Sequence, residues 1–108
     1  MTYRFLAPAL VEISEAAEFY DGQVPGLGID FLDELDEAVN IILRFPTAWS
    51  QLSGEYRHYS LRRFPYSVIY TLADNDCILI ISVFHQRREP QSWRRNLKAA
   101  YSHFLLER

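Results

Sequence analysis

The sequence predicts an α+β fold, a small sandwich in which an N-terminal strand and a helical hairpin lie on an antiparallel sheet. Two observations carry this prediction. The first half of the chain repeats apolar residues at helical spacing, and the second half holds three β-rich stretches with short connections, before a last helical stretch. The expected order is therefore β-α-α-β-β-β-α. A chain of 108 residues suits one hydrophobic core, so residues 1–108 are expected to form a single domain.

The first three elements are a short strand and two helices. Residues 3–7 are aromatic and apolar and end at Pro8, as a short strand does. From Pro8 on, apolar residues recur at helical spacing, and proline is well suited to the first turn of a helix. A second helix is expected to begin at about Ile29 and to end before Pro46. The glycine-rich connection between them favours an antiparallel hairpin. The apolar stripes are Leu10, Ile13, Ala17 and Tyr20 in the first helix and Phe31, Leu35, Ala38, Ile42 and Phe45 in the second, widened by Leu32, Val39 and Leu43.

Three strands and a helix complete the expected fold. Residues 55–61 alternate and are polar, as in an exposed strand, and residues 77–85 form the β-rich run of a central strand. Between them, residues 66–73 form a strand that the turn at 74–76 connects to the last one. The last helix is expected to open at Pro90 and to run to about residue 106. One strand face holds Tyr66, Val68, Tyr70 and Leu72, and the apolar side of the helix holds Trp93, Leu97, Ala100 or Tyr101, Phe104 and Leu105.

The composition excludes several classes of protein. With 49% hydrophobic and 23% charged residues the chain has the balance of a globular protein, and no apolar run approaches the ~20 residues that span a bilayer. The first residues turn acidic where a secretion signal needs an apolar stretch. Cys77 is the only cysteine, so no internal disulfide can form. These observations predict a cytoplasmic protein with no membrane partner.

Charge is distributed unevenly along the chain. The formal net charge is −3, but residues 1–54 hold only Arg4 and Arg44 against nine acidic residues, whereas residues 55–108 hold nine Lys and Arg against five. An acidic half and a basic half can neutralise each other within the fold, or the basic half can serve an anionic partner. Charge patterning alone leaves both interpretations open.

Two motifs in the second half point to a known family. The sequence LRRFPYSVIY (61–70) is followed by a β-rich run that ends in the pattern H-x-x-R-x-P-x-x-W, from His85 to Trp93. Together with the PGLG connection, FLDEL and the helix ending in RFP, this order resembles the RelE/ParE superfamily of bacterial toxins over roughly residues 3–95. The resemblance implies the α+β fold described above.

The resemblance also implies a function: a growth-inhibiting toxin of a type II toxin–antitoxin system, with a cognate antitoxin as partner and a possible hetero-oligomer with it. ParE-like members inhibit DNA gyrase and perform no known chemistry, whereas RelE-like members cleave messenger RNA on the ribosome. The ParE-like branch is favoured, because Gln86 follows His85 where RelE-like nucleases tend to have a tyrosine, and the only lysine is Lys98. A third possibility is a non-toxic relative that binds an antitoxin. No cofactor and no metal are expected.

Candidate site residues follow from the chemistry of each alternative. RNA cleavage needs proton carriers and cations around the phosphorus, which His85, Arg63 and Arg87 are expected to supply if the protein is RelE-like. Tyrosine and arginine are the residue types that anchor interfaces. The segment from Tyr56 to Tyr70 is therefore expected to be a functional face. The candidates for binding a target or antitoxin are Arg57, Tyr59, Arg62, Arg63, Tyr66, Arg88 and Trp93.

Several of these candidates have a plain structural interpretation as well. Arg57 and His58 are neighbours on a predicted strand, so their side chains should lie on opposite faces, and His58 is expected to be a cross-strand polar neighbour. Trp93 is expected to anchor the core with its N–H satisfied. Arg62 or Arg63 can pair with an acid of the helical hairpin.

Overall fold

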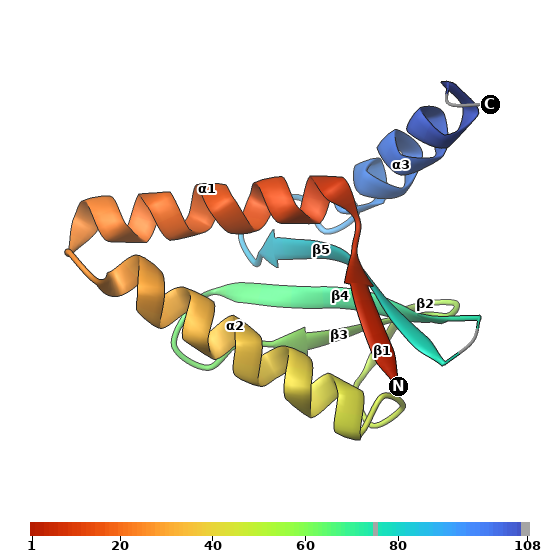
Figure 1. Ribbon diagram of the computed structural model, residues 1–108, viewed down its shortest axis with the longest axis horizontal. Helices are drawn as coiled ribbons and strands as arrows, with labels where there is room; N and C mark the ends of the chain where they lie inside the picture. The colour runs from red at the N-terminus through yellow and green to blue at the C-terminus, as the bar shows by residue number, and fades with distance from the viewer. Residues whose placement is uncertain (75, 107–108) are drawn as a thin grey trace.

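The computed structural model describes residues 1–74 and 76–106, with the backbone alone described from residue 101 on. It confirms the α+β class, with one strand more than expected. Figure 1 shows α1 and α2 lying against one face of a sheet, while α3 projects away from the sheet beside the N-terminal end of α1. The elements are β1 (Thr2–Phe5), α1 (Ala7–Gln23), α2 (Leu27–Arg44), β2 (Gln51–Ser53), β3 (Tyr56–Ser60), β4 (Tyr66–Ala73), β5 (Cys77–His85) and α3 (Arg94–Leu106).

The strands form one five-stranded sheet in the order β1-β5-β4-β3-β2. Neighbours from β2 to β5 are antiparallel, whereas β1 pairs in parallel with β5. The unexpected strand, β2, has three residues and an irregular register with β3, so it is too short to show an alternating pattern. Strands β4 and β5 have the predicted bounds, 66–73 and 77–85. Among the described residues, no helix is long and apolar enough to cross a membrane.

The two long helices and one face of the sheet enclose the larger core, which we call the hairpin core. Most of the apolar stripe predicted for α2 is buried in this core, but its last residue, Phe45, is exposed. In the stripe predicted for α1, Leu10 is exposed. Gly28 lets the helices approach closely, because a Cβ at this position would lie 2.5 Å from the carbonyl oxygen of Ala17. The buried members are Ile13, Ala16, Phe31, Leu35, Ala38, Val39, Ile42, Leu61, Phe64, Val68, Tyr70, Ile78, Ile80 and Val83.

The opposite face of the sheet carries a smaller cluster, which we call the second core. Its buried members are Ile69, Ile81, Phe84 and Trp93. Helix α3 begins at Arg94, four residues later than expected from Pro90, because residues 90–93 form turns that bring the Trp93 ring onto the sheet. Leu97 packs against this cluster as predicted, whereas the predicted Tyr101, Phe104 and Leu105 side chains lie outside the described side chains.

A β-bulge in β5 divides the side chains between the two cores. Ile69 of β4 pairs with Ser82 and the next residue, Tyr70, pairs with Ile80, so Ile81 is the extra residue. The bulge changes which alternate residues face the helices: Ile80 enters the hairpin core before it and Val83 after it. It also leaves Ser82 fully buried.

Candidate functional site

The segment from Tyr56 to Tyr70 does not form a single face. Arg57 and Tyr59 pair across the sheet with Tyr70 and Val68, whose side chains lie in the hairpin core. Arg57 donates from Nη1 to the carbonyl oxygen of Trp49 at 2.7 Å, and Tyr59 meets the Trp49 ring edge-on.

The neighbouring residues of β3, Tyr56 and His58, lie on the opposite face of the sheet, over the second core. The Tyr56 ring lies 5.2 Å from that of Trp93, and His58 pairs across the strands with Ile69 and lines a hollow over the second core. The expected alternation of Arg57 and His58 is confirmed. The two candidate binding residues of β3, Arg57 and Tyr59, therefore share the hairpin side, whereas Tyr56 and His58 lie on the other side.

Arg62 and Arg63 are tied to α2, as one of the two interpretations expected. Both backbone N–H groups donate to the carboxylate of Glu34, at 2.6 Å from Arg62 and 3.1 Å from Arg63. The Arg63 guanidinium lies 3.4 Å from Glu34 and 3.9 Å from Asp30, and it stacks over the ring of Phe64. Acidic and basic halves of the sequence therefore neutralise each other here.

The end of β5 brings together several other candidates. His85 pairs across the sheet with Tyr66, and their ring centroids lie 5.0 Å apart. His85 Nδ1 accepts a hydrogen bond from the backbone N–H of Arg87 at 3.0 Å, which leaves Nε2 to carry the proton of the neutral ring. Burial raises the pKa of the Tyr66 hydroxyl. The Arg87 side chain is exposed.

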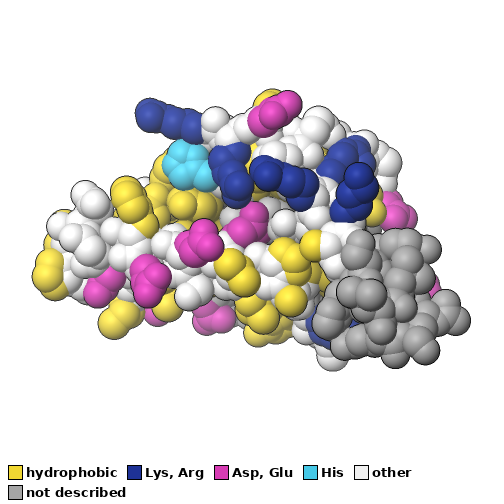
Figure 2. All heavy atoms as spheres, turned by 90° about the horizontal axis from the view of Figure 1, so that it is seen from above, with side chains coloured by type: hydrophobic (Ala, Val, Ile, Leu, Met, Phe, Trp, Pro, Cys, Tyr) yellow, Lys and Arg dark blue, Asp and Glu magenta, His cyan; other side chains and the backbone are white. Residues whose placement is uncertain are grey.

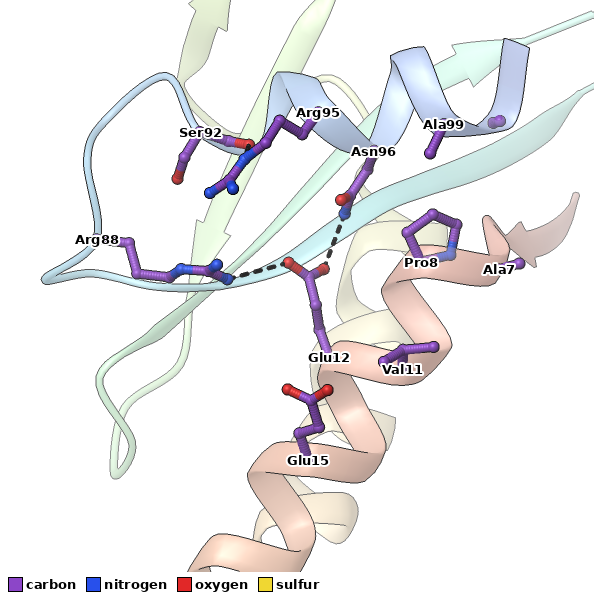
Figure 3. Close-up of a pocket in the computed structure, with 11 residues that line it drawn as sticks. Ala7, Pro8, Val11, Glu12, Glu15, Arg88, Ser92, Arg95, Asn96 and Ala99 are labelled. Atoms are coloured by element: carbon purple, nitrogen blue, oxygen red, sulfur yellow. Dashed lines mark hydrogen bonds and ion pairs between the residues drawn. The ribbon is translucent and has the colours of Figure 1, made fainter. Parts of the chain in front are cut away.

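Glu12 of α1, which was not among the sequence candidates, is the most highly coordinated side chain near these residues. Its Oε1 accepts hydrogen bonds from the Ser82 hydroxyl at 2.9 Å, the Val83 backbone N–H at 3.1 Å and the Asn96 amide at 2.9 Å. Its Oε2 lies 3.5 Å from Nη1 of Arg88. Figure 3 shows Arg88 and Asn96 reaching this carboxylate from opposite sides. We call Glu12, Ser82, Arg88 and Asn96 the polar clamp.

The polar clamp exists because β1 ends before β5 does. The last pair of the parallel ladder is Phe5 with Ile80, so the edge of β5 beyond Ile80 needs other hydrogen-bond partners. Asn96 donates to the carbonyl oxygen of Ile81 at 2.9 Å, and Glu12 accepts from Val83. Burial raises the pKa of Glu12 above its usual value, against the opposing effects of its hydrogen bonds and Arg88.

Beside the polar clamp lies a hollow of about 730 Å³ between the start of α1 and α3. Its apolar lining comes from Ala7, Pro8 and Val11 on α1 and from Ala99 and Ala100 on α3, and Figure 3 shows Arg95 at its α3 side. Over the described residues, no group of His, Cys, Asp and Glu could hold a metal ion.

Four arginines follow His85 in the loop after β5 and the first turn of α3: Arg87, Arg88, Arg94 and Arg95. We call them the basic row. All four are exposed. Figure 2, which looks onto α1, shows Lys and Arg side chains gathered along one side of the molecule beside a histidine.

The structure therefore brings His85, Arg87, Arg88 and Tyr66 into one region and leaves other candidates outside it. Arg63 turns to the acids of α2. Trp93 is only 1% exposed and anchors the second core, as one interpretation expected, but its Nε1 has no hydrogen-bond partner among the described residues. A buried tryptophan offers little surface to a partner.

Comparison with known proteins places the chain in a family. Residues 3–90 match the family described as the ParE toxin of the type II toxin–antitoxin system parDE. Among solved structures, the chain resembles one of the chromosomal ParDE system of P. aeruginosa, with a TM-score of 0.69, 16% identity and coverage of 79% of this chain and 95% of the other. It also resembles the isolated E. coli RelE toxin, with a TM-score of 0.60, 19% identity and coverage of 91% and 96%. No curated protein matches the sequence.

Proposed function

The chain belongs to the ParE toxin family of type II toxin–antitoxin systems, and we propose that it inhibits bacterial growth by binding DNA gyrase. The observation that carries this proposal is the family match over residues 3–90, which includes both helices of the hairpin and all of the sheet except Thr2. A cognate antitoxin encoded beside the toxin is proposed to neutralise it in a hetero-oligomer. Gyrase acts in the cytoplasm, so the toxin is proposed to act there too.

The site supports binding more than catalysis. The three residues expected to cleave RNA are not presented together: Arg63 is held by Asp30 and Glu34, while His85 and Arg87 lie at the end of β5. The exposed arginines after His85, by contrast, form a surface that an anionic partner could contact without any chemical step.

One observation favours the RelE-like alternative. His85 lies against Tyr66 with Arg88 lining the same small hollow, and an imidazole beside a guanidinium can move a proton and hold a phosphate. A ribosome-dependent ribonuclease therefore remains the second candidate function, with His85 as its proton carrier.

The two functions differ in what stops first when the protein is induced without antitoxin. For gyrase inhibition, brief radiolabelled pulses should show early loss of DNA synthesis while messenger RNA stays intact. Early loss of protein synthesis with broken messenger ends would contradict the proposal and support the ribonuclease. Unchanged growth with soluble protein present would indicate a non-toxic relative that binds the antitoxin.

A variant of His85 sharpens this test. His85→Gln keeps a polar side chain but cannot carry a proton near neutral pH. Gyrase inhibition should tolerate it, whereas RNA cleavage should fall by roughly a hundredfold or more, the usual contribution of a general acid or base. His58→Gln, on the other side of the sheet, is the matched control.

A further inference from the structure

Positive charge is concentrated where β5 leads into α3. Residues 85–98 contain five of the chain's eleven Lys and Arg and one acid, Glu89, so the rest of this acidic protein holds six basic residues against thirteen acidic ones. On the face that Figure 2 shows, most basic side chains gather along one side, and most of the acidic side chains in view lie below them. A charge distribution of this kind attracts polyanions despite the negative total.

Most arginines of the basic row have no acidic partner to neutralise them. Within the described side chains only Arg88 makes an ion pair, with Glu12. The other contacts are to neutral groups: Arg94 donates to Gln91 at 2.6 Å and to Ser53 at 2.7 Å, and Arg95 donates from Nε to the carbonyl oxygen of Ser92 at 3.4 Å. These contacts orient the guanidinium groups and leave further N–H donors on each of them.

The position of Arg94 and Arg95 is unfavourable for the helix itself. They occupy the first turn of α3, a helix of 13 residues with no acid in that turn. The N-terminal end of a helix carries partial positive charge and disfavours cations there. An anion bound at this place would reverse the effect, since it would interact with the guanidinium groups and the helix end together. Contacts with Gln91, Ser53 and the Trp93 ring account for Arg94 within the fold, and a bound anion would give both arginines a further favourable partner.

The chemistry of the basic row indicates whether its anionic partner is an acidic protein surface or a phosphate group. Protein–protein interfaces centre on exposed apolar or aromatic anchors, but Trp93, the large apolar side chain between the arginines, is buried. Arg94 lies over its ring, with 4.7 Å between the guanidinium carbon and the ring centroid. The row thus offers forked guanidinium donors, and the apolar groups beside it are the small side chains and Val11 that line the adjacent hollow. Guanidinium groups match the paired oxygens of phosphate.

We infer that the basic row binds the phosphate backbone of duplex DNA. The inference deepens the proposed function: a toxin bound to gyrase would also contact the DNA that gyrase holds. The polar clamp contributes by fixing Arg88 through Glu12 and α3 through Asn96, so the row is presented as one surface. Contacts of this kind carry no sequence preference and weaken with salt.

The test measures DNA binding without gyrase, so that its failure is distinct from failure of the proposed function. The full-length protein is titrated onto a fluorescent duplex at several salt concentrations, and anisotropy gives the binding constant. For the double variant Arg87→Ala/Arg95→Ala we expect weaker binding and a slope of log K against log salt that is smaller by about two, because each lost phosphate contact removes about 0.9. The control is Arg4→Ala/Arg44→Ala, which removes two exposed arginines outside the row and should leave the slope unchanged.

Three results would overturn the inference: no DNA binding by the unaltered protein, equal slopes for the two double variants, or displacement of DNA by poly-glutamate at the same charge concentration as by unlabelled duplex. The last result would assign the row to an acidic protein instead. Circular dichroism of each variant checks that the fold is intact, so that a weaker signal cannot come from unfolding. In a second arm, gyrase inhibition by the variant is measured on plasmid DNA. A selective loss there would connect the row to the proposed function.

Discussion

The two faces of the sheet are covered in different ways. Of the described side chains, the hairpin core buries fourteen between two long helices and the sheet, and nearly all of them are hydrocarbon or aromatic. Among the side chains that the structure describes, the second core has four buried members, Ile69, Ile81, Phe84 and Trp93. Beside it the polar clamp joins α1, β5 and α3 through a partly buried carboxylate.

The hairpin face thus contributes mainly to the stability of the fold, whereas the other face positions the side chains of the candidate site. Burial of apolar surface is non-directional and scales with area, so the hairpin face supplies most of the free energy of folding. Hydrogen bonds to a partly buried carboxylate contribute less net free energy but fix geometry, and removing one partner is costly. The half-buried His85 and the exposed basic row all lie at the end of the molecule that the polar clamp organises.

The largest effect should come from a cavity in the hairpin core. Phe31 is fully buried between the helices and the sheet, so Phe31→Ala should lower the free energy of unfolding by about 3–5 kcal/mol. Its neighbour Leu32 is 41% exposed, and Leu32→Ala should cost less than about 1 kcal/mol. Urea unfolding followed by circular dichroism measures both. Similar losses for the two variants would contradict the assignment of this face as the main source of stability.

A smaller loss is expected when the polar clamp is broken. Glu12→Ala removes the acceptor for the Ser82 hydroxyl, the Val83 N–H and the Asn96 amide, and each buried donor left without a partner costs about 1–3 kcal/mol unless water reaches it. Access of water from the adjacent hollow should limit the total to roughly 2–3 kcal/mol. Glu15→Ala, one turn further along α1 at an exposed position, should change stability by less than about 0.5 kcal/mol. Equal effects at the two positions would remove the case for the polar clamp.

The contact between the two helices can be tested at one glycine. Gly28→Ala places a Cβ 2.5 Å from the Ala17 carbonyl oxygen, so the helices must separate, at a cost of about 1–3 kcal/mol. Gly22 lies near the end of α1 with no atom within 4 Å of an added Cβ, and Gly22→Ala should stabilise the protein by up to about 1 kcal/mol because alanine favours the helix. Thermal unfolding should therefore shift in opposite directions, and a shared direction would contradict this packing.

The smallest predicted effect is a dependence of the free energy of unfolding on pH, caused by Glu12 of the polar clamp. Burial raises the pKa of Glu12 in the folded chain above 4.5. A group with a raised folded pKa contributes its stability below the unfolded pKa and loses it as pH rises through the folded pKa. The free energy of unfolding should thus fall, relative to that of Glu12→Gln, as pH rises from about 4.5 through the folded pKa. Parallel pH profiles for the two proteins would show that Glu12 does not titrate differently on folding.

Local patterns in the sequence were sufficient for most of the fold. The bounds of β4 and β5 follow from two β-rich runs and the turn at 74–76, and the helical hairpin follows from spacing and two prolines. These signals lie within a few residues of each other, so no distant contact is needed to read them. The family resemblance also came from residues close together in the chain, and the match over 3–90 confirms it.

Contacts between distant residues decided the site. Glu12 meets Ser82 across 70 positions of sequence, and in sequence it reads as one more acid on the polar side of a helix. Arg57 and Tyr59 lie on one surface and His58 on another, because the two faces of β3 meet different cores. The parallel pairing of β1, the bulge at Ile81 and the late start of α3 are likewise solutions to packing and hydrogen bonding between segments. The sequence by itself determined the elements and the family, because periodicity is local. Only the tertiary structure decided which charges are neutralised and which stay exposed, because that depends on what burial brings together.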